Sequence, residues 1–536
     1  MVTGSGEVEF TADALEGLVK LDMLQVGLDP DTVVESVFVD VAALRTSPVP
    51  YGYVQGRIRL TDPGPSDVGF NLALPARFGG RYLLNAQGGA GGALQDPPAD
   101  LLGEGTVVAS TDRGVVTGHV LDLSYFNDPA RVAEALNSAG RAVHATAQVT
   151  QLLTRRYYGV EQFPRYIAGC SAGGISGWAN VRREGTRDFD AVLAGDFPTP
   201  SAIISVQWAR VAQHQCRHPE SWIPPELLRA GEAAIVAAYD GVDGAVDGLI
   251  WDDRLIDFDL DVLRDAGFSE AQIGTFVVAT SPWVYRAGVR PLTVPGLSFS
   301  RITVFEETVT GRVPPPWLGG AWRNDGDWRT SGVPRGLYVV ESRLSTTAPG
   351  SGFIDLDLEA ADVQRLFANT VEPWNDPADP FDLTDFRDGG GKLITYVGVA
   401  NQSNAYLGKV LAWQAAARDR ASLDAGDDPE PSGSLDLNAV ERVNTWFRHY
   451  SVPGMMHCTG GPGPHDVYDQ LLRALLAWVE DGVPPEDVVA ENPSSGRTFL
   501  LCPEPQRAVY SGTGDVDDAA NWRSRLEPRF LEVPSS

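Results

Sequence analysis

The stretch GCSAGG, residues 169–174, places a serine among small residues and directly after a cysteine. The apolar run RYIAG leads into it, and a segment with helical character follows. Strand, G-x-S-x-G and helix in this order are typical of a nucleophile elbow, a sharp turn that lifts the serine hydroxyl above the carboxyl edge of a sheet. Ser171 is therefore the candidate nucleophile for attack on a carbonyl carbon.

Such a serine needs a base, and His457 in VPGMMHCTGGPG is the best placed of the 7 histidines. It follows a late predicted strand in a Gly- and Pro-rich loop, which is where the base belongs in the chain order Ser, Asp, His. His144 falls within a predicted helix and is interpreted as a packing or surface residue. His214 and His218 flank Cys216 in HQCRH, but this spacing fits no closed zinc set and a fourth ligand is missing.

Two cysteines flank the candidate nucleophile and base, because Cys170 precedes Ser171 and Cys458 follows His457. In a working dyad the hydroxyl and the imidazole approach to about 3 Å, so their chain neighbours are brought close as well. A disulfide between Cys170 and Cys458 is then geometrically natural. Two buried free thiols remain the alternative.

Predicted strands alternate with predicted helices from residue 78 onward. The expected strands lie in GRYLLNAQGG, TVVASTD, RYIAG, AVLAG, KLITYVGVA and WFRHYSV, and long helices are expected over 128–159 and 466–482. This alternation predicts an α/β fold with a mainly parallel sheet covered on both faces.

The alternation stops near residue 200 and returns at residue 392, so the intervening segment is interpreted as an insertion. We expect a catalytic domain formed by residues 1–200 and 386–536, with residues 1–55 as an N-terminal extension, and a lid domain over 201–385. The insertion is rich in tryptophan, and these side chains could line a ligand pocket or form the insertion's own core.

Composition excludes some classes of partner. The 536 residues carry a formal net charge of −29, which argues against nucleic acid or an anionic membrane surface as a partner. No apolar run approaches the roughly 20 residues that cross a bilayer, and the first ten residues lack the features of a signal peptide. Either the protein is cytoplasmic or a leader has been removed.

Several separate blocks resemble the tannase and feruloyl esterase family between about residue 70 and about residue 525. They are LPARFGGRYLLNAQGGAGG, VVASTDRG, YYGVEQFPRYIAGCSAGG, DFDAVLAG, GGKLITYVGVA, VPGMMHCTGGPG and YSGTGDVDDAAN. The resemblance implies an α/β-hydrolase fold with a large inserted lid domain, a secreted or periplasmic location, and hydrolysis of carboxylic esters, often of aromatic acids. It also implies the Cys170–Cys458 disulfide, because a Cys-Ser pair bridged to a His-Cys pair is the hallmark of the family.

The resemblance assigns the nucleophile to Ser171 and the base to His457. The oxyanion hole is assigned to the backbone N–H of Ala172 together with one N–H from the Gly88–Gly89 loop, where donors would face the charge that develops on the carbonyl oxygen. The implied partner is a small-molecule ester, with no organic cofactor, no nucleic acid and no membrane.

The acid of the triad departs from the family pattern. Where the family reads like Y-H-G-W-A-D, this chain ends at Asn401, and asparagine cannot supply the negative charge that stabilises an imidazolium. The protein could be a feeble enzyme, a non-catalytic binding relative, or an enzyme whose acid has moved. The third hypothesis has a candidate in Asp196, which follows the strand AVLAG where relatives read A-G-A-P, while Asn401 remains the alternative group that orients His457.

A second site is predicted in YDGVDGAVDGLI, residues 239–250. Its closely spaced oxygens and tight-turn glycines suit a structural Ca²⁺, although the bidentate Glu of an EF-hand is absent. The stretch also resembles the calcium loop of the family's lid domain, and the alternative is a solvated acidic turn. The expected ligands are Asp240, Asp243 and Asp247 with the carbonyls of Ala245 and Leu249.

The leading hypothesis is a secreted serine esterase that works through an acyl-enzyme. The acid and alcohol halves of its substrate are not specified by the sequence. The pairing of Cys216 and Cys502 is also left open, because the number of cysteines does not determine it.

Overall fold

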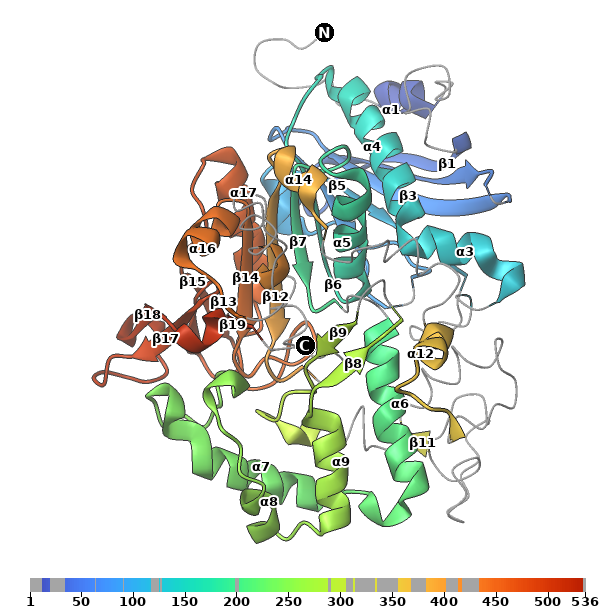
Figure 1. Cartoon of the computed structure of the whole chain (residues 1–536). Coiled ribbons are helices and arrows are strands. Elements are labelled where there is room, and N and C mark those ends of the chain that lie inside the picture. Colours follow the sequence, from blue (N-terminus) through green and yellow to red (C-terminus); the bar gives the residue numbers. More distant parts are fainter. Residues whose placement is uncertain are drawn as a thin grey trace.

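A computed structural model describes most of the chain. The described residues are 12–19, 34–62, 64–89, 91–116, 125, 128–197, 202–287, 291–304, 312–313, 333–334, 355–367, 382–401, 413–416 and 433–533. The central element is a nine-stranded sheet with the strand order β1-β2-β3-β5-β4-β6-β7-β12-β14 (Figure 1). Its strands are β1 (Val34–Arg45), β2 (Tyr51–Leu60), β3 (Ser66–Pro75), β4 (Tyr82–Ala86), β5 (Val107–Thr111), β6 (Arg165–Cys170), β7 (Ala191–Gly195), β12 (Lys392–Gly398) and β14 (Phe447–Val452).

The sheet has a parallel part and an antiparallel part. Strands β5, β4, β6, β7, β12 and β14 pair in parallel, as the alternating sequence pattern predicts. Strands β1, β2 and β3 continue the sheet beyond β5 in antiparallel fashion. The segment expected as an N-terminal extension, residues 1–55, therefore supplies β1 and part of β2 to the main sheet.

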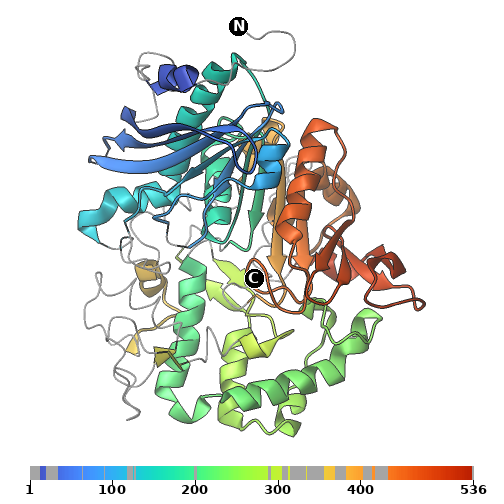
Figure 2. The ribbon, with the colours of Figure 1, turned by 180° about the vertical axis from the view of Figure 1, so that it is seen from behind.

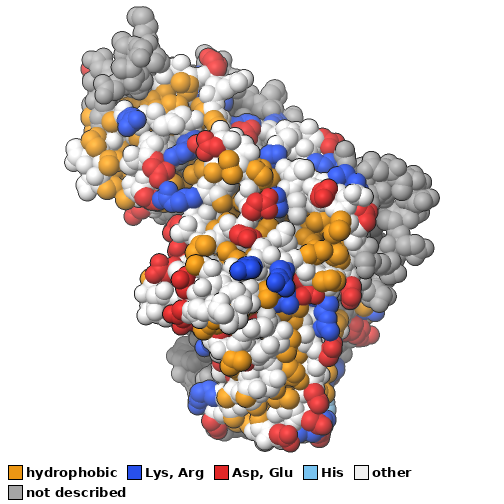
Figure 3. Space-filling view, turned by 90° about the vertical axis from the view of Figure 1, so that its left-hand side faces the viewer, with side chains coloured by type: hydrophobic (Ala, Val, Ile, Leu, Met, Phe, Trp, Pro, Cys, Tyr) orange, Lys and Arg blue, Asp and Glu red, His pale blue; other side chains and the backbone are white. Residues whose placement is uncertain are grey.

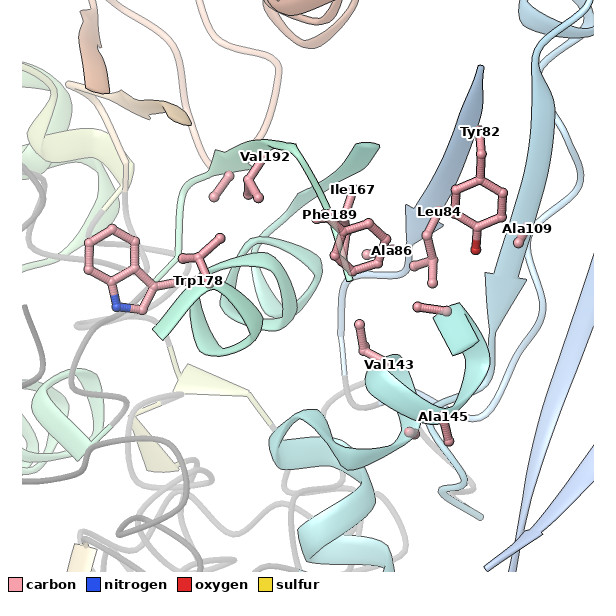
Figure 4. Close-up of a cluster of buried hydrophobic side chains, with 14 of the residues drawn as sticks. Tyr82, Leu84, Ala86, Ala109, Val143, Ala145, Ile167, Trp178, Phe189 and Val192 are labelled. Carbon is pink, nitrogen blue, oxygen red and sulfur yellow. The ribbon is translucent and has the colours of Figure 1, made fainter. Parts of the chain in front are cut away.

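Helices cover both faces of the sheet. Helices α4 (Ala142–Tyr158), α5 (Ala172–Glu184) and α16 (Leu437–Asn444) pack on one face, whereas α2 (Ala99–Gly103) and α17 (Val467–Glu480) pack on the other, which Figure 2 shows from behind. Side chains of β6 alternate between these cores because successive residues of a strand point to opposite faces. Ile167 joins the α4–α5 side, drawn in Figure 4, and Tyr166 joins the α17 side.

The predicted long helix over 128–159 is interrupted. A short 3-10 turn at Pro129–Arg131 leads into α3 (Val132–Leu136), and a widened turn over Asn137–Arg141 separates α3 from α4. Gly140 lies inside this turn with φ 135°, a value that side-chain-bearing residues rarely adopt and glycine adopts readily. The single helix that we predicted is therefore wrong at this glycine.

Between β7 and β12 the chain leaves the sheet and forms helices beside its carboxyl edge (Figure 1). These are α6 (Ala202–Arg217), α7 (Pro225–Tyr239), α8 (Asp261–Asp265), α9 (Glu270–Thr280) and α12 (Ala361–Phe367), with the hairpin β8 (Trp283–Tyr285) and β9 (Leu292–Val294). They enclose two apolar clusters of their own. The proposed boundaries of this insertion at 201 and 385 stay a prediction.

Two tryptophans of the insertion, Trp251 and Trp283, are buried in different clusters. Trp283 is buried within one of the insertion's clusters, and Trp251 stacks on Trp522 of the C-terminal segment with ring centroids 4.2 Å apart. Tryptophans 317, 322, 328 and 374 lie outside the described residues. The interpretation as the insertion's own core therefore holds for Trp283, whereas Trp251 is buried against the C-terminal segment.

The remaining elements are short. They comprise α1 (Ala12–Val19), α14 (Thr384–Asp388), β10 (Arg312–Val313), β11 (Val333–Pro334), β13 (Gly433–Ser434), β15 (Val488–Asn492), β16 (Arg497–Leu501), β17 (Gln506–Tyr510), β18 (Trp522–Leu526) and β19 (Glu532–Val533). None of the described helices is long and apolar enough to span a bilayer. On the face drawn in Figure 3, acidic and basic side chains are intermingled.

Candidate active site

The candidate site residues follow four adjacent parallel strands at their carboxyl ends. Ser171 follows β6, Asp196 follows β7, Asn401 follows β12, and His457 lies in the loop after β14. Carboxyl ends of parallel strands share one edge of a sheet, and such an edge is where open α/β sheets bind ligands. The topology therefore gathers these four residues at the edge that the inserted helices face.

The turn at Ser171 has the geometry of a nucleophile elbow. Ser171 has φ 59° and ψ −124°, and helix α5 begins at the next residue. A Cβ atom on Gly169 would lie 2.7 Å from the carbonyl carbon of Gly173, and one on Gly173 would clash with the carbonyl oxygen of Ala86. The two glycines of the G-x-S-x-G pattern are thus required by close contacts between β6, α5 and β4.

A disulfide joins Cys170 to Cys458, with their Cα atoms 5.9 Å apart and 288 positions between them in sequence. The predicted bridge is confirmed, and the alternative of two free thiols is wrong. Ser171 and His457 are each the immediate neighbour of a bridged cysteine, so the bridge ties the nucleophile turn to the histidine loop.

The other cysteines do not take part in this bridge. Cys502 is a buried free thiol, and burial raises its pKa to about 12. The side chain of Cys216 lies outside the described residues.

Asp196 is fully buried at the centre of these segments and has φ 43°. Its Oδ2 accepts a hydrogen bond from the backbone N–H of Cys458 at 2.7 Å. Its Oδ1 accepts from the backbone N–H of Gly398 at 3.0 Å and from the side-chain amide of Asn401 at 2.5 Å. The carboxylate of Asp196 therefore binds the loop that carries His457, and Asn401 is hydrogen-bonded to that carboxylate.

The carboxylate of Asp196 also lies near the two bridged sulfur atoms, since ligand-type atoms of Cys170, Asp196 and Cys458 fall within 4.8 Å of one another. Thiolates bind metals, whereas the sulfur atoms here are engaged in a disulfide. This cluster is consequently no metal site.

The residues predicted for the oxyanion hole lie beside the nucleophile. A Cβ atom on Gly88 would lie 3.2 Å from the carbonyl oxygen of Cys170 and 3.7 Å from Cβ of Ser171. Gly89 has φ 69°, and Ala172 is the first residue of α5, where backbone N–H groups lack partners within the helix. Both candidate donor segments therefore meet next to Ser171.

One charged residue behind these segments was not singled out from the sequence. The guanidinium of Arg113 donates hydrogen bonds to the carbonyl oxygens of Gly89 and Ala172. Arg113 lies in the quoted block VVASTDRG, but only the fold shows which backbone groups surround its side chain.

His144, His214 and His218 have other surroundings in the described structure. His144 is buried, and its Nδ1 lies 2.8 Å from Oδ2 of Asp188, which confirms its packing role. His214 and His218 have ring centroids 5.0 Å apart, and burial lowers the pKa of His214. In the described part of the chain they belong to no close group of three metal-ligand side chains.

The predicted calcium loop folds back on its own backbone. Asp240 accepts from the N–H groups of Asp247 and Gly248, and Asp243 accepts from the N–H of Ala245 at 3.0 Å. Asp247 accepts from the N–H of Leu249, also at 3.0 Å.

The second oxygen of Asp247 contacts two groups outside the loop. It accepts from the indole N–H of Trp251 at 2.9 Å and pairs with the guanidinium of Arg497. Burial, reinforced by the nearby charges of Asp247 and Asp240, raises the pKa of Asp243 to about 7.

The oxygen donors of the loop suit Ca²⁺, but its carboxylates do not form a preformed metal site. Among the described residues, the close groups of metal-ligand side chains do not include these three aspartates. A bound cation would require Asp240 and Asp247 to exchange present hydrogen bonds for metal contacts.

Comparisons with known proteins agree with this geometry. The family model "Tannase and feruloyl esterase" matches residues 52–274 and 355–525. The chain is 26% identical over 491 residues to a probable feruloyl esterase B-1 of Aspergillus terreus, covering 84% of this chain and 82% of that relative. It is also 26% identical over 530 residues to the mono(2-hydroxyethyl) terephthalate hydrolase of Piscinibacter sakaiensis, covering 87% and 83% of the two chains.

Solved structures show the same architecture. Feruloyl esterase B from Aspergillus oryzae superposes with a TM-score of 0.71 at 20% identity, covering 95% of this chain and all of the other. The tannin acyl hydrolase of Aspergillus niger superposes with a TM-score of 0.65 at 20% identity over 97% and 96% of the two chains. The chain therefore has an α/β-hydrolase fold with a large inserted lid, and it belongs to the tannase and feruloyl esterase family of carboxylic-ester hydrolases.

Proposed function

We propose that the protein hydrolyses carboxylic esters through a serine-bound acyl-enzyme, with Ser171 as nucleophile, His457 as base and Asp196 as the acid that supports His457. The observation that carries this proposal is the covalent and hydrogen-bonded link between the two chain segments. The Cys170–Cys458 bridge holds the neighbours of Ser171 and His457 together, and the Asp196 carboxylate accepts from the N–H of Cys458.

The chemistry proceeds in two acyl transfers. Ser171 Oγ bonds to the ester carbonyl carbon while its proton passes to the His457 imidazole, and the C–O bond to the alcohol then breaks as that proton passes to the leaving oxygen. Water repeats the sequence on the acyl-enzyme and releases the acid. The N–H groups of Ala172 and Gly89, with Gly88 beside them, stabilise the negative charge on the carbonyl oxygen in each tetrahedral intermediate.

Asp196 is preferred to Asn401 as the acid for an electrostatic reason. A carboxylate stabilises an imidazolium, whereas an amide only orients it. Asn401 faces Asp196 at 2.5 Å, so a second carboxylate at that position would meet the first in a buried site and one of them would be protonated. An amide at 401 is therefore the partner that a carboxylate at 196 requires.

Esters of aromatic acids are the proposed substrate class. The support comes from the relatives, which include a probable feruloyl esterase B-1 and a mono(2-hydroxyethyl) terephthalate hydrolase. Secretion to an oxidising compartment is proposed as well, because disulfides such as Cys170–Cys458 persist there and are rare in a reducing cytosol.

A structural Ca²⁺ in the lid is the third part of the proposal. Asp240, Asp243 and Asp247 with the carbonyls of Ala245 and Leu249 would hold it, and the ion would offset part of the negative charge of the three carboxylates. The support is the hard-oxygen donor set and the raised pKa of Asp243, which reflects negative charge gathered in a buried place.

Rapid mixing with p-nitrophenyl acetate tests the mechanism. We expect a burst of p-nitrophenol equal to the enzyme concentration, and we expect Ser171→Ala to abolish it. A fluorophosphonate should label Ser171 in the wild type only. Steady hydrolysis that survives Ser171→Ala would overturn the serine mechanism.

The substrate class is tested separately, by comparing kcat/KM for galloyl, feruloyl, terephthaloyl and aliphatic esters.

A further inference from the structure

Arg113 lies two residues beyond the end of β5 and has an unusual backbone conformation. Its backbone has φ 61°, in the left-handed region that non-glycine residues rarely adopt, and its side chain is only 3% exposed. Backbone conformations of this kind persist where surrounding contacts hold them, and they cluster at functional sites.

The guanidinium of Arg113 bridges two segments beside the nucleophile. Nη2 donates to the carbonyl oxygen of Gly89 at 2.8 Å, and Nη1 donates to the carbonyl oxygen of Ala172 at 3.4 Å. Gly91 also packs closely against this side chain, since a Cβ atom on Gly91 would lie 3.0 Å from Nε of Arg113. The N–H of Gly92 adds a hydrogen bond to the carbonyl oxygen of Asp112 at 2.8 Å.

Among the described residues, no carboxylate forms an ion pair with the guanidinium of Arg113. Burial lowers the pKa of Arg113, and Asp112 and Tyr125 oppose this shift only through longer-range attraction. Within the described residues, Nε has no hydrogen-bond acceptor, and the hydrogen bonds of the two Nη atoms go to carbonyl oxygens. The hydrogen bonds of the Arg113 guanidinium are thus directed at backbone carbonyls of two segments that meet beside Ser171.

We propose that Arg113 is a positioning residue that locks together the two halves of the oxyanion hole. This inference rests on the proposed serine mechanism, in which the donors are N–H groups of Ala172 and of the Gly88–Gly89 loop. The donors belong to segments far apart in the chain, and both must lie about 3 Å from the oxygen that becomes negative. The planar guanidinium of Arg113 donates to both carbonyl oxygens at once. It thereby holds the peptide groups that adjoin these carbonyls in one orientation.

The proposal predicts a loss in the chemical step with little change in substrate binding. Arg113→Met should lower kcat for p-nitrophenyl acetate about 100-fold, the scale of a small displacement of catalytic groups, while KM changes little. Arg113→Lys keeps the charge but cannot hold both carbonyls in one plane, so its kcat should also fall substantially. The Ki of a trifluoromethyl ketone, which places an oxyanion in the hole once Ser171 adds to it, should rise in proportion to the loss of kcat/KM.

Active-site titration with a fluorophosphonate separates this role from simple loss of folding, because kcat is then expressed per competent serine. The matched control is Arg165→Met. Arg165 also donates to backbone carbonyls, those of Thr186 and Arg187, and it pairs in addition with Asp190, but it lies at the opposite end of β6 from Ser171.

Three outcomes decide the matter. If Arg113→Met lowers kcat per titrated site and weakens the ketone while Arg165→Met does neither, the positioning role is supported. If Arg113→Met only lowers the melting temperature and leaves kcat per titrated site and the ketone Ki unchanged, the inference is overturned while the serine mechanism stands. If wild-type Ser171 is not labelled and Ser171→Ala retains activity, the proposed function and this inference fall together.

Discussion

The side-chain amide of Asn401 donates a hydrogen bond of 2.5 Å to Oδ1 of Asp196. This contact joins the end of β12 to the end of β7, two strands that pair in parallel. The other carboxylate oxygen of Asp196 accepts from the backbone of Cys458. The carboxylate thus joins Asn401 to the loop that carries His457.

Exchange of the acid is the first test. Asp196→Asn should lower kcat/KM by about 10⁴-fold, the cost of removing the triad carboxylate in a serine protease, because the imidazolium loses its counter-charge. Asn401→Ala removes one hydrogen bond to a charged group and should cost about tenfold. Both are measured with p-nitrophenyl acetate on titrated active sites. The relocated acid would be refuted if Asp196→Asn kept wild-type kcat while Asn401→Ala abolished it.

Introducing a second carboxylate is the converse test. In Asn401→Asp, two buried carboxyl groups face each other, so the pKa of one should rise above its unfolded value. Such a group destabilises the fold as pH rises, because the native state binds more protons than the unfolded state. The melting temperature of this variant should fall further below that of wild type between pH 5 and pH 9. Asn401→Ala is the control, and its deficit should not vary with pH.

His144 provides a pH-dependent test of the core. Burial lowers the pKa of His144, but the hydrogen bond and charge of Asp188, with the charge of Glu184, outweigh burial and raise it overall. A raised folded-state pKa contributes stability that is full below the unfolded pKa, near 6.5, and is lost as pH rises through the folded value.

The free energy of unfolding of wild type should therefore exceed that of His144→Gln most at about pH 5.5 to 6 and less at pH 9. Urea denaturation at each pH measures the difference. A difference that grows toward alkaline pH would contradict the assigned charge on His144.

Removing the bridge should destabilise the protein. Cys170→Ala combined with Cys458→Ala opens a loop closed over 288 positions, and the loop-entropy model gives about 6 kcal/mol as an upper value for that change. We expect a lower melting temperature and a loss of activity that exceeds the loss of folded protein. Cys502→Ser is the control, since its thiol is free: dithiothreitol should lower the melting temperature of that variant as it does for wild type. Equal stability with and without reductant would count against the bridge as a stabilising element.

Chelation tests the calcium loop. EDTA should lower the melting temperature. Added Ca²⁺ at about 100 times its Kd should raise the free energy of unfolding again by about 2.7 kcal/mol. Asp243→Asn should remove this response, whereas Asp257→Asn, at an exposed carboxylate outside the loop, should keep it. Arg497→Gln removes one of the two partners of the second Asp247 oxygen and should strengthen the response. No change with EDTA in either wild type or Arg497→Gln would leave the loop as an acidic turn.

Local patterns account for the part of the molecule that could be predicted. The strand before Ser171, the small residues of its turn and the order of strands and helices are encoded within short windows, so the sheet and the elbow followed from them. Cys170 and Cys458 were paired because each adjoins a residue of the same candidate dyad. The position of Asp196 at a strand end was likewise visible, since AVLAG is a buried strand followed by a charge.

Features that depend on contacts between distant segments could not be predicted from the sequence. Gly140 sits in a pattern that reads as continuous helix, and only its backbone geometry shows the break. Strand β1 joins the sheet through pairing with β2, which a run of alternating residues does not specify. Arg113 and Arg497 have their partners in other segments of the chain, so their contacts with Gly89 and with Asp247 had no local signal.

The bridge between Cys170 and Cys458 also turns the intervening polypeptide into a covalent ring that contains the entire inserted lid. A protease that cuts once within the lid would therefore release no fragment, and the nicked molecule would separate into two pieces only after reduction. The inserted segment is tethered at both ends, and a single cleavage there would leave the turn at Ser171 and the loop of His457 covalently linked.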